Sequence, residues 1–236
     1  MNVVSQYLSG DVLRTRRVSD LVPHATLDLP TLPARLLADW ERETSSRLDL
    51  EPGDVEQLPL ARARARWPDH RRCVRAAADW TASMGLGTVL ATADIALMAC
   101  RGARYHHDGA RYGAMAFCNL FLSEDKGLDL HFPRIDLRIP LVRGTVVVFD
   151  TGQPHAVVAR GRNVFDVADF PDGRECSQVF LTWELPIENA DVAHAMRIVF
   201  DTDPVEGHGS EEEQIRVDGR CADVCAESGR WISSAS

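Results

Sequence analysis

The segment between residues 88 and 186 consists of short apolar or alternating runs separated by glycine, proline and aspartate. The runs read, in order, TVLATADIALMAC, AMAFCNLFL, LDLHF, IDLRI, GTVVVF, HAVVA and SQVFLTWEL. Short runs that are rich in β-branched and aromatic residues and end at turn-forming residues predict β-strands. A further strand is expected at RYHHD, which brings the total to about eight, the strand number of a double-sheet jelly roll.

Two segments before these runs, 31–50 and 69–85, have apolar residues at helical spacing. In the first segment, for example, Leu37, Trp40 and Leu48 fall on one helical face. After Pro186, residues 188–201 predict another helix. The chain therefore has helices on both sides of its β-rich part.

We expect a single domain over residues 1–206, because the chain shows no internal repeat and no linker. It should contain a helical layer over about 30–86, a β core over about 88–186 and a C-terminal helix over about 187–200. Residues 207–236 are polar, with an acidic run, and predict a partly disordered tail. The predicted fold class is mainly β with flanking helices: a double-stranded β-helix, or cupin-like jelly roll, with an N-terminal helical layer.

Composition and charge narrow the range of partners. The 236 residues are 45% hydrophobic, so a sizeable core is available. The chain has 26 basic and 35 acidic residues and a net charge of −9, which argues against binding to nucleic acid. No apolar stretch is long enough for a membrane helix, and no leader pattern begins the chain, so we expect a cytoplasmic protein with no membrane partner.

The six cysteines show no regular framework, which favours free thiols in a reducing compartment. Cys221 and Cys225 are close enough in sequence to form a disulfide or to share a metal, but no further paired ligands accompany them. Their pairing is left open by the sequence.

The segment RYHHDGARYG, residues 104–113, carries the strongest candidate for metal binding. On a strand, side chains alternate between the two faces, so His106 and Asp108 can bind one ion while His107 points away. A third ligand is available at His155, which begins a later apolar run. Two histidines and one carboxylate on one face of an ion form the facial triad of non-haem Fe(II) oxygenases.

A lone His-x-Asp motif is a weak signal, because histidines at strand edges are often surface-exposed or hydrogen-bonded. Here the motif and His155 both fall at strand ends within the expected jelly roll, in the order short motif, several strands, single histidine, final strand. The metal site is therefore the favoured interpretation of these three residues.

Residues 95–186 resemble the Fe(II)/2-oxoglutarate-dependent dioxygenase superfamily. The matching segments are YHHDG, FCNLFLSEDKGLDLHFP, PLVRGTVVVFDTGQPHAVV and SQVFLTWELP, which follow the family's order. The resemblance implies Fe(II) held by His106, Asp108 and His155, with 2-oxoglutarate chelating the iron through its 2-oxo acid end and O2 as the second co-substrate. It also implies that Asn119 lines the pocket beside the iron.

In this family a basic residue near or on the strand after the distal histidine binds the far carboxylate of 2-oxoglutarate. Because Lys126 is the only lysine and precedes His155, the anchor is expected to be an arginine. The candidates are Arg160, Arg162 and Arg174. We favour Arg174, which lies at the start of the final strand, with Arg160 as the second choice, although strict alternation points both outward.

The expected function is hydroxylation of an unactivated C–H bond in a small molecule, such as an amino acid or a derivative, with succinate and CO2 as co-products. Two alternatives remain open. One is a cupin-like metalloenzyme that does not use 2-oxoglutarate, and the other is a hydroxylase of a protein or peptide residue. A small-molecule substrate is favoured because no separate docking domain is visible in the sequence.

Overall fold

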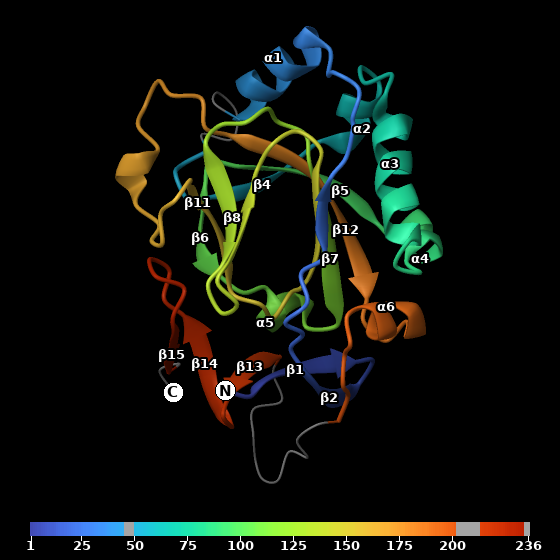
Figure 1. The fold of residues 1–236 in the computed structure, drawn as a ribbon, viewed down its shortest axis with the longest axis vertical. Coiled ribbons are helices and arrows are strands. Elements are labelled where there is room, and N and C mark those ends of the chain that lie inside the picture. Colours follow the sequence, from blue (N-terminus) through green and yellow to red (C-terminus); the bar gives the residue numbers. More distant parts are fainter. Residues whose placement is uncertain (45–49, 202–212, 234–236) are drawn as a thin grey trace.

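The computed structural model describes residues 1–44, 50–201 and 213–233, and two facing β-sheets form its centre (Figure 1). The major sheet has the strand order β3-β10-β7-β12-β5-β4, and the minor sheet has the order β6-β11-β8-β9. The major strands are β3 (His24–Thr26), β4 (Val55–Leu58), β5 (Ile95–Cys100), β7 (Met115–Phe121), β10 (Thr145–Asp150) and β12 (Gln178–Pro186). The minor strands are β6 (Ala103–His106), β8 (Leu128–Phe132), β9 (Leu137–Pro140) and β11 (His155–Ala159).

The order of the central strands identifies the fold. From β5 to β12 the chain passes between the two sheets, with only β8 and β9 following each other in the same sheet. All pairs between these strands are antiparallel. Eight strands wound in this way form a double-stranded β-helix. The predicted fold class is therefore confirmed.

Strand β12 shows how the two faces of the major sheet differ. Leu181 and Trp183 point away from the minor sheet and pack with helices, whereas Phe180 and Thr182 face the space between the sheets. The helices on the outer face are α1 (Ala34–Arg42), α2 (Leu60–Arg64), α3 (His70–Ala82) and α4 (Gly87–Thr92). They supply buried residues to the core on that side, so the major sheet is covered on both faces.

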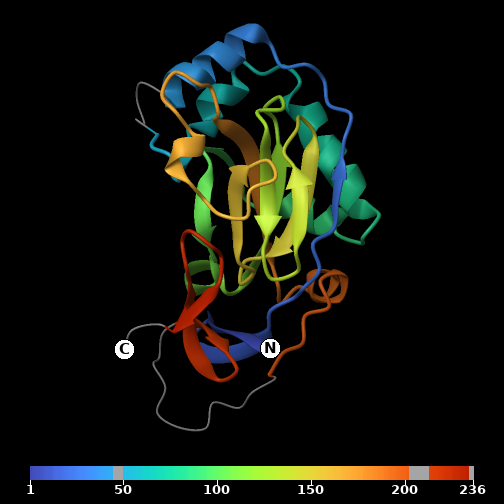
Figure 2. The same ribbon diagram turned by 60° about the vertical axis from the view of Figure 1, so that its left-hand side comes forward.

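A third sheet lies at one end of the barrel and joins the two ends of the described chain (Figures 1 and 2). Its strand order is β15-β14-β13-β1-β2, and Val3 pairs with Val217 across β1 and β13. The strands are β1 (Val3–Ser9), β2 (Val12–Arg17), β13 (Gln214–Val217), β14 (Arg220–Val224) and β15 (Trp231–Ser233). Short helices α5 (Gly109–Tyr112) and α6 (Ala190–Ala195) and a 3-10 turn, Val167–Asp169, complete the described elements.

Several sequence predictions need correction. The expected strand over 88–100 begins only at Ile95, because residues 87–92 form α4 and bury Val89 and Leu90 against the helical layer. A short apolar run does not distinguish a strand from a buried helical turn. The strand expected over RYHHD ends at His106.

The polar tail expected over 207–236 is wrong for residues 214–233, which contain β13, β14 and β15. These strands are held by pairing with β1 and by the burial of Ile215 against Val3 and Val18. No strand was predicted for the segments that form β1, β2, β3 and β4. Leu48 of the first predicted helix and residues 207–212 and 234–236 of the predicted tail lie outside the described residues.

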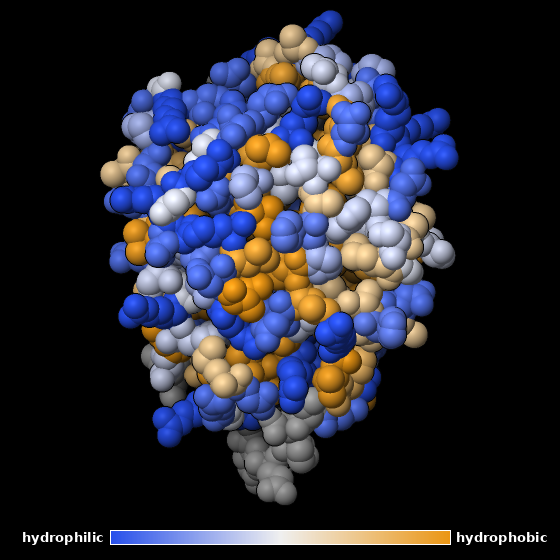
Figure 3. Space-filling view, viewed as in Figure 1, coloured by the Kyte–Doolittle hydropathy of each residue, from blue (hydrophilic) through white to orange (hydrophobic). Residues whose placement is uncertain are grey.

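The face shown in Figure 3 is mostly hydrophilic and the six cysteines form no disulfide, as the composition and the irregular cysteine spacing predict. Hydrophilic side chains cover most of the face in Figure 3, and apolar side chains gather near its centre, over the barrel. Within the described ranges, every helix is too short or too polar to cross a bilayer. All six cysteines are free, and the Cys221 thiol donates a hydrogen bond to Gln214 Oε1 at 2.8 Å.

Candidate metal centre

Three side chains meet where β6 ends and β11 begins. His106 is the last residue of β6, His155 is the first residue of β11, and the two are direct partners across the antiparallel pair. Asp108 follows two residues later, as the cap residue before α5. His106 Nε2 lies 3.8 Å from Asp108 Oδ1, and His155 Nε2 lies 3.6 Å from Asp108 Oδ2. One potential ligand atom from each residue lies within 4.8 Å of the others.

Each of the two histidine rings is oriented by a hydrogen bond at Nδ1, while Nε2 faces Asp108. His106 Nδ1 lies 2.7 Å from the carbonyl oxygen of Arg104, and His155 Nδ1 lies 2.9 Å from that of Gln153. A carbonyl accepts a hydrogen bond, so Nδ1 of each ring carries a proton, and Nε2 is the nitrogen that faces Asp108. Nε2 of each ring is thus the atom placed to bind a metal ion, with Nδ1 held by the backbone.

The electrostatics of the cluster favour a cation. Burial lowers the pKa of His155 well below its usual value, and the neighbouring His106 adds to this effect. The imidazole is therefore held neutral, the form that binds metals. Burial also raises the pKa of Asp108, while His106, His107 and Arg111 act in the opposite direction. A cation between these groups would relieve the cost of burying the carboxylate.

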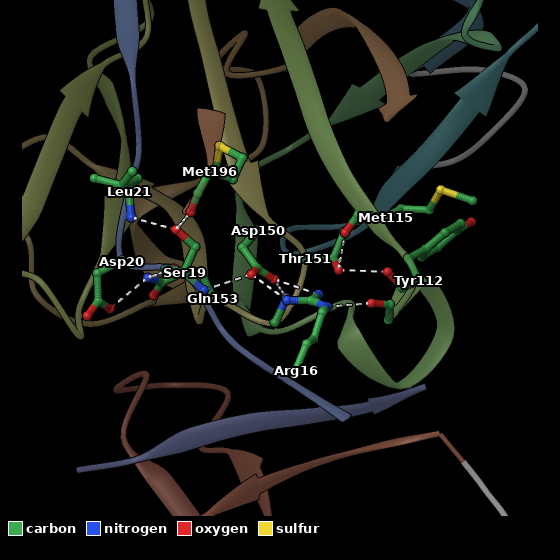
Figure 4. A network of polar contacts seen from close by, with 12 residues as sticks. Arg16, Ser19, Asp20, Leu21, Tyr112, Met115, Asp150, Thr151, Gln153 and Met196 are labelled. Atoms are coloured by element: carbon green, nitrogen blue, oxygen red, sulfur yellow. Dashed lines mark hydrogen bonds and ion pairs between the residues drawn. The ribbon is translucent and has the colours of Figure 1, made fainter. Parts of the chain in front are cut away.

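The backbone around Asp108 is fixed by the turn that precedes β11. The Asp108 amide donates to the carbonyl oxygen of Thr151 at 2.8 Å. The Thr151 hydroxyl lies 2.7 and 2.8 Å from the carbonyl oxygens of Tyr112, the last residue of α5, and Met115, the first residue of β7 (Figure 4). The segment that carries Asp108 and the segment that carries His155 are thus joined directly.

The same turn is anchored to the N-terminal part of the chain by a buried ion pair. Arg16 on β2 and Asp150 at the end of β10 have fully buried side chains, and their atoms approach to 2.5 and 2.9 Å (Figure 4). Arg16 also donates to the carbonyl oxygen of Gly113, next to α5. Gln153 donates to the carbonyl oxygen of Ser19. The segments that carry the candidate metal ligands are therefore held by residues 97 to 134 positions away in sequence.

A cavity of about 290 Å³ opens beside the cluster, between the two sheets. At the metal end it is lined by the three ligands, Arg111 and Tyr112. Its remaining wall is mostly apolar, with Phe121, Leu130, Phe149, Val157 and Phe180 among its residues. A larger hollow of about 480 Å³ lies by α1 and α2, but the clustered ligands found among the described residues are not there.

The other predicted site residues have different positions. Asn119 lines the cavity, and its Oδ1 atom has no hydrogen-bond partner among the described residues. Arg160 and Arg174 do not line it. Arg160 binds Asp125 and Asp129, and Arg174 is exposed, with its Nη2 atom 3.5 Å from the carbonyl oxygen of Lys126.

The third arginine candidate, Arg162, is bound to Asp166 and Asp169. Side-chain alternation predicts that Arg160 points away from the cavity. Its contact with Asp129 agrees, because Leu130, the next residue on β8, lines the cavity and Asp129 therefore points the other way. The structure therefore does not bring the arginines predicted as anchors to the metal centre.

His107 lies on the other side of the chain from the cluster. Its side chain is 6% exposed, its Nε2 atom is 3.8 Å from Asp223 Oδ1, and its ring lies 5.8 Å from that of Trp231. It packs under the third sheet and does not reach the cavity. The sequence reasoning missed Arg111, on the cavity rim, and the supporting residues Arg16 and Asp150, for which no local pattern gives a signal.

The donor set fits a divalent transition-metal ion. Two imidazole nitrogens and a carboxylate suit Fe(II) and related ions, and three ligands from one side leave positions open for small molecules. Ligand bonds of about 2.0–2.2 Å bring donor atoms of one ion within about 4.4 Å of each other, which the 3.6 and 3.8 Å separations satisfy.

The far carboxylate of 2-oxoglutarate does not fit the inner wall. At the start of β12, where the resemblance implies a basic anchor, the side chain on the same face as Phe180 is Gln178, an uncharged amide. Apart from the histidines, Arg111 is the sole basic side chain of the described cavity lining, and it lies exposed beside Tyr112.

Comparison with known proteins adds little to this picture. No family model matches the chain, and no curated protein matches it. A crystal structure of a Pseudomonas putida prolyl-4-hydroxylase is similar over 70% of this chain and 92% of the hydroxylase chain, with 20% sequence identity and a TM-score of 0.39. A similarity of this size does not identify an activity.

Proposed function

We propose that this protein is an Fe(II)-dependent oxygenase that hydroxylates a small molecule, with a 2-oxo acid as the co-substrate that supplies electrons. The observation that carries the proposal is the grouping of His106, Asp108 and His155 beside a cavity between the sheets of a double-stranded β-helix. The resemblance in sequence implies 2-oxoglutarate as the 2-oxo acid, with succinate and CO2 as its products.

The protein's own residues have three tasks in this proposal. His106 and His155 offer imidazole nitrogen ligands, with His155 held neutral by burial, and Asp108 would neutralise part of the metal charge. The hydrogen bonds to Arg104 and Gln153 hold the rings in place. Bound iron would supply the capacity to activate O2, and the apolar wall would keep water away from the reacting groups.

Hydroxylation is favoured over halogenation because the carboxylate ligand is present. With Asp108 on the metal, no protein ligand position is left free for a halide. Once a substrate is found, turnover under labelled O2 in chloride-containing buffer is expected to give a product with one labelled oxygen atom. A chlorinated product, detected by mass spectrometry, would exclude the proposed reaction.

A second candidate is a metalloenzyme of the same barrel shape that does not use a 2-oxo acid. It is favoured by one observation: Gln178 lies where the resemblance implies a basic anchor. Such an enzyme would bind its substrate to the metal directly.

Anaerobic absorption spectroscopy separates the two candidates. A 2-oxo acid that chelates Fe(II) in the protein gives a weak visible charge-transfer band, and we expect this band with at least one 2-oxo acid. The Asp108→Ala variant is the matched control and should give none. If Fe(II) binds but no 2-oxo acid produces the band, the second candidate is correct.

A further inference from the structure

Two aromatic rings line the cavity at what we call its inner end. Phe121 on β7 and Phe180 on β12 are direct partners in the major sheet, and their ring centroids lie 5.0 Å apart at an angle of 30°. Both are almost fully buried, at 1% and 7% exposure. Leu130 and Val157 face them from the minor sheet. The part of the wall that these four side chains form is therefore hydrocarbon.

The polar side chains nearest the two rings are neutral, and Glu184, an acidic side chain that also lines the cavity, lies four residues beyond Phe180 on β12, opposite Phe117. Asn119 and Thr182 are direct partners on β7 and β12, and both line the cavity. They can form hydrogen bonds but cannot balance a negative charge. Arg111 could do so only at the rim, where it is exposed and its guanidinium carbon lies 5.4 Å from the centre of the Tyr112 ring. The charged Arg111 side chain thus lies at the rim, whereas the side chains next to Phe121 and Phe180 on the inner wall are neutral.

An unpaired carboxylate placed against such a wall would lose its hydration without gaining a partner, which is strongly unfavourable. An alkyl or aryl group in the same place would instead be removed from water, which is favourable. The inner cavity therefore discriminates against a dicarboxylic acid and in favour of a monocarboxylic acid with an apolar tail.

We propose that the co-substrate of this enzyme is a 2-oxo acid with an apolar tail, which occupies the space in front of Phe121 and Phe180. This inference rests on the proposed function and specifies the class of its co-substrate. The 2-oxo acid group would reach the metal and the tail would contact the two rings, with no cation needed at the inner end.

The reaction balances without a further reductant. The bond between the carboxylate and the oxo carbon breaks and CO2 leaves. One atom of O2 enters the new, shorter carboxylate, and the other forms the hydroxyl group on the substrate carbon. The 2-oxo acid and the substrate C–H bond each give two electrons, which together reduce one O2.

The experiment compares two 2-oxo acids on the Fe(II)-loaded protein without O2. 4-Methyl-2-oxopentanoate and 2-oxoglutarate are titrated separately, and the visible charge-transfer band gives the dissociation constant of each. We expect 4-methyl-2-oxopentanoate to bind at least about tenfold more tightly than 2-oxoglutarate. Metal content is measured in the same samples.

A charge placed on the inner wall should reverse the preference. Phe180→Arg is expected to favour 2-oxoglutarate over 4-methyl-2-oxopentanoate, because the guanidinium can pair with its far carboxylate. Phe180→Leu is the matched control and should keep the original preference. Circular dichroism and metal content show whether each variant is folded, and the comparison on the unaltered protein does not depend on them.

The outcomes separate this inference from the proposed function. If 2-oxoglutarate binds as tightly as 4-methyl-2-oxopentanoate or more tightly, the inference is wrong while a 2-oxo acid co-substrate is retained. If neither acid nor any other 2-oxo acid gives a band although Fe(II) is bound, both the inference and the proposed co-substrate are wrong.

Discussion

The two ends of one cavity are built in different ways. At the metal end, charged and polar groups are fixed by hydrogen bonds to the backbone, as with His155 and the carbonyl oxygen of Gln153. At the inner end, Phe121 and Phe180 are fixed by packing alone. The first arrangement sets the positions of three ligand atoms, and the second sets only a shape and a polarity.

The residues that hold the two ends of the cavity in place also come from different parts of the fold. The inner wall comes from alternating residues of the barrel strands themselves. The metal end depends in addition on Arg16, which reaches Asp150 from the third sheet, outside the barrel. Damage to the third sheet should therefore affect metal binding more than it affects the apolar wall.

The largest expected effect comes from breaking the buried ion pair. Arg16→Met leaves the Asp150 carboxylate buried without its partner, and should lower the free energy of unfolding by about 3–5 kcal/mol. Metal affinity should fall about tenfold or more, because the turn before His155 loses its anchor. Chemical denaturation and metal titration measure the two effects.

The double variant Arg16→Met/Asp150→Leu is the control for this prediction. It removes both charges, so its loss of stability should be clearly smaller than that of Arg16→Met. Equal stability of Arg16→Met and the unaltered protein would show that the ion pair does not hold the metal end.

Removing a ligand should abolish metal binding while leaving the inner end intact. Asp108→Ala is expected to weaken Fe(II) binding at least about a hundredfold, which corresponds to roughly 2.7 kcal/mol. His107→Ala, next in sequence but turned toward Trp231, should change it by less than about twofold. Calorimetric titration without O2 gives both constants, and a strong effect of His107→Ala would contradict the assigned ligands.

Metal binding should in turn stabilise the fold. Free Fe(II) at a hundred times its dissociation constant is expected to raise the free energy of unfolding by about 2.7 kcal/mol, since only the folded chain brings the three ligands together. Thermal unfolding with and without the metal measures this gain. Asp108→Ala should show almost none of it, and a gain of the same size in that variant would place the ion elsewhere.

The smallest effect is expected at the inner end. Phe121→Leu keeps the wall apolar and should reduce stability by roughly 1 kcal/mol, with metal affinity changed by less than about twofold. A large loss of metal affinity in this folded variant would mean that the two ends of the cavity are not independent.

The sequence predicted the barrel strands and the three clustered residues because both depend on local patterns. Short apolar and β-branched runs such as HAVVA and SQVFLTWEL predict β11 and β12, and the alternation of side chains along a strand separates His106 from His107. Asp108 was predicted as a member of the cluster, but its local structure was not predicted: it precedes helix α5 and does not lie on a strand.

What the sequence did not predict depends on contacts between distant segments. Strands β13 to β15 form where a polar segment finds β1 as a partner, and no composition rule gives that pairing. The position of the predicted arginine anchors has a related cause: Arg160 pairs with Asp125 and Asp129 outside the cavity. Partnerships of this kind between distant segments appear only once the strands are placed.

The position of a bound ion tests the central claim most directly. In crystals grown without O2 and soaked with Fe(II), anomalous diffraction should show one ion about 2.0–2.2 Å from His106 Nε2, His155 Nε2 and an Asp108 carboxylate oxygen, with His107 not coordinated. Full occupancy of another site with no ion between these three residues, or coordination by His107 in place of His106, would contradict the metal centre described above.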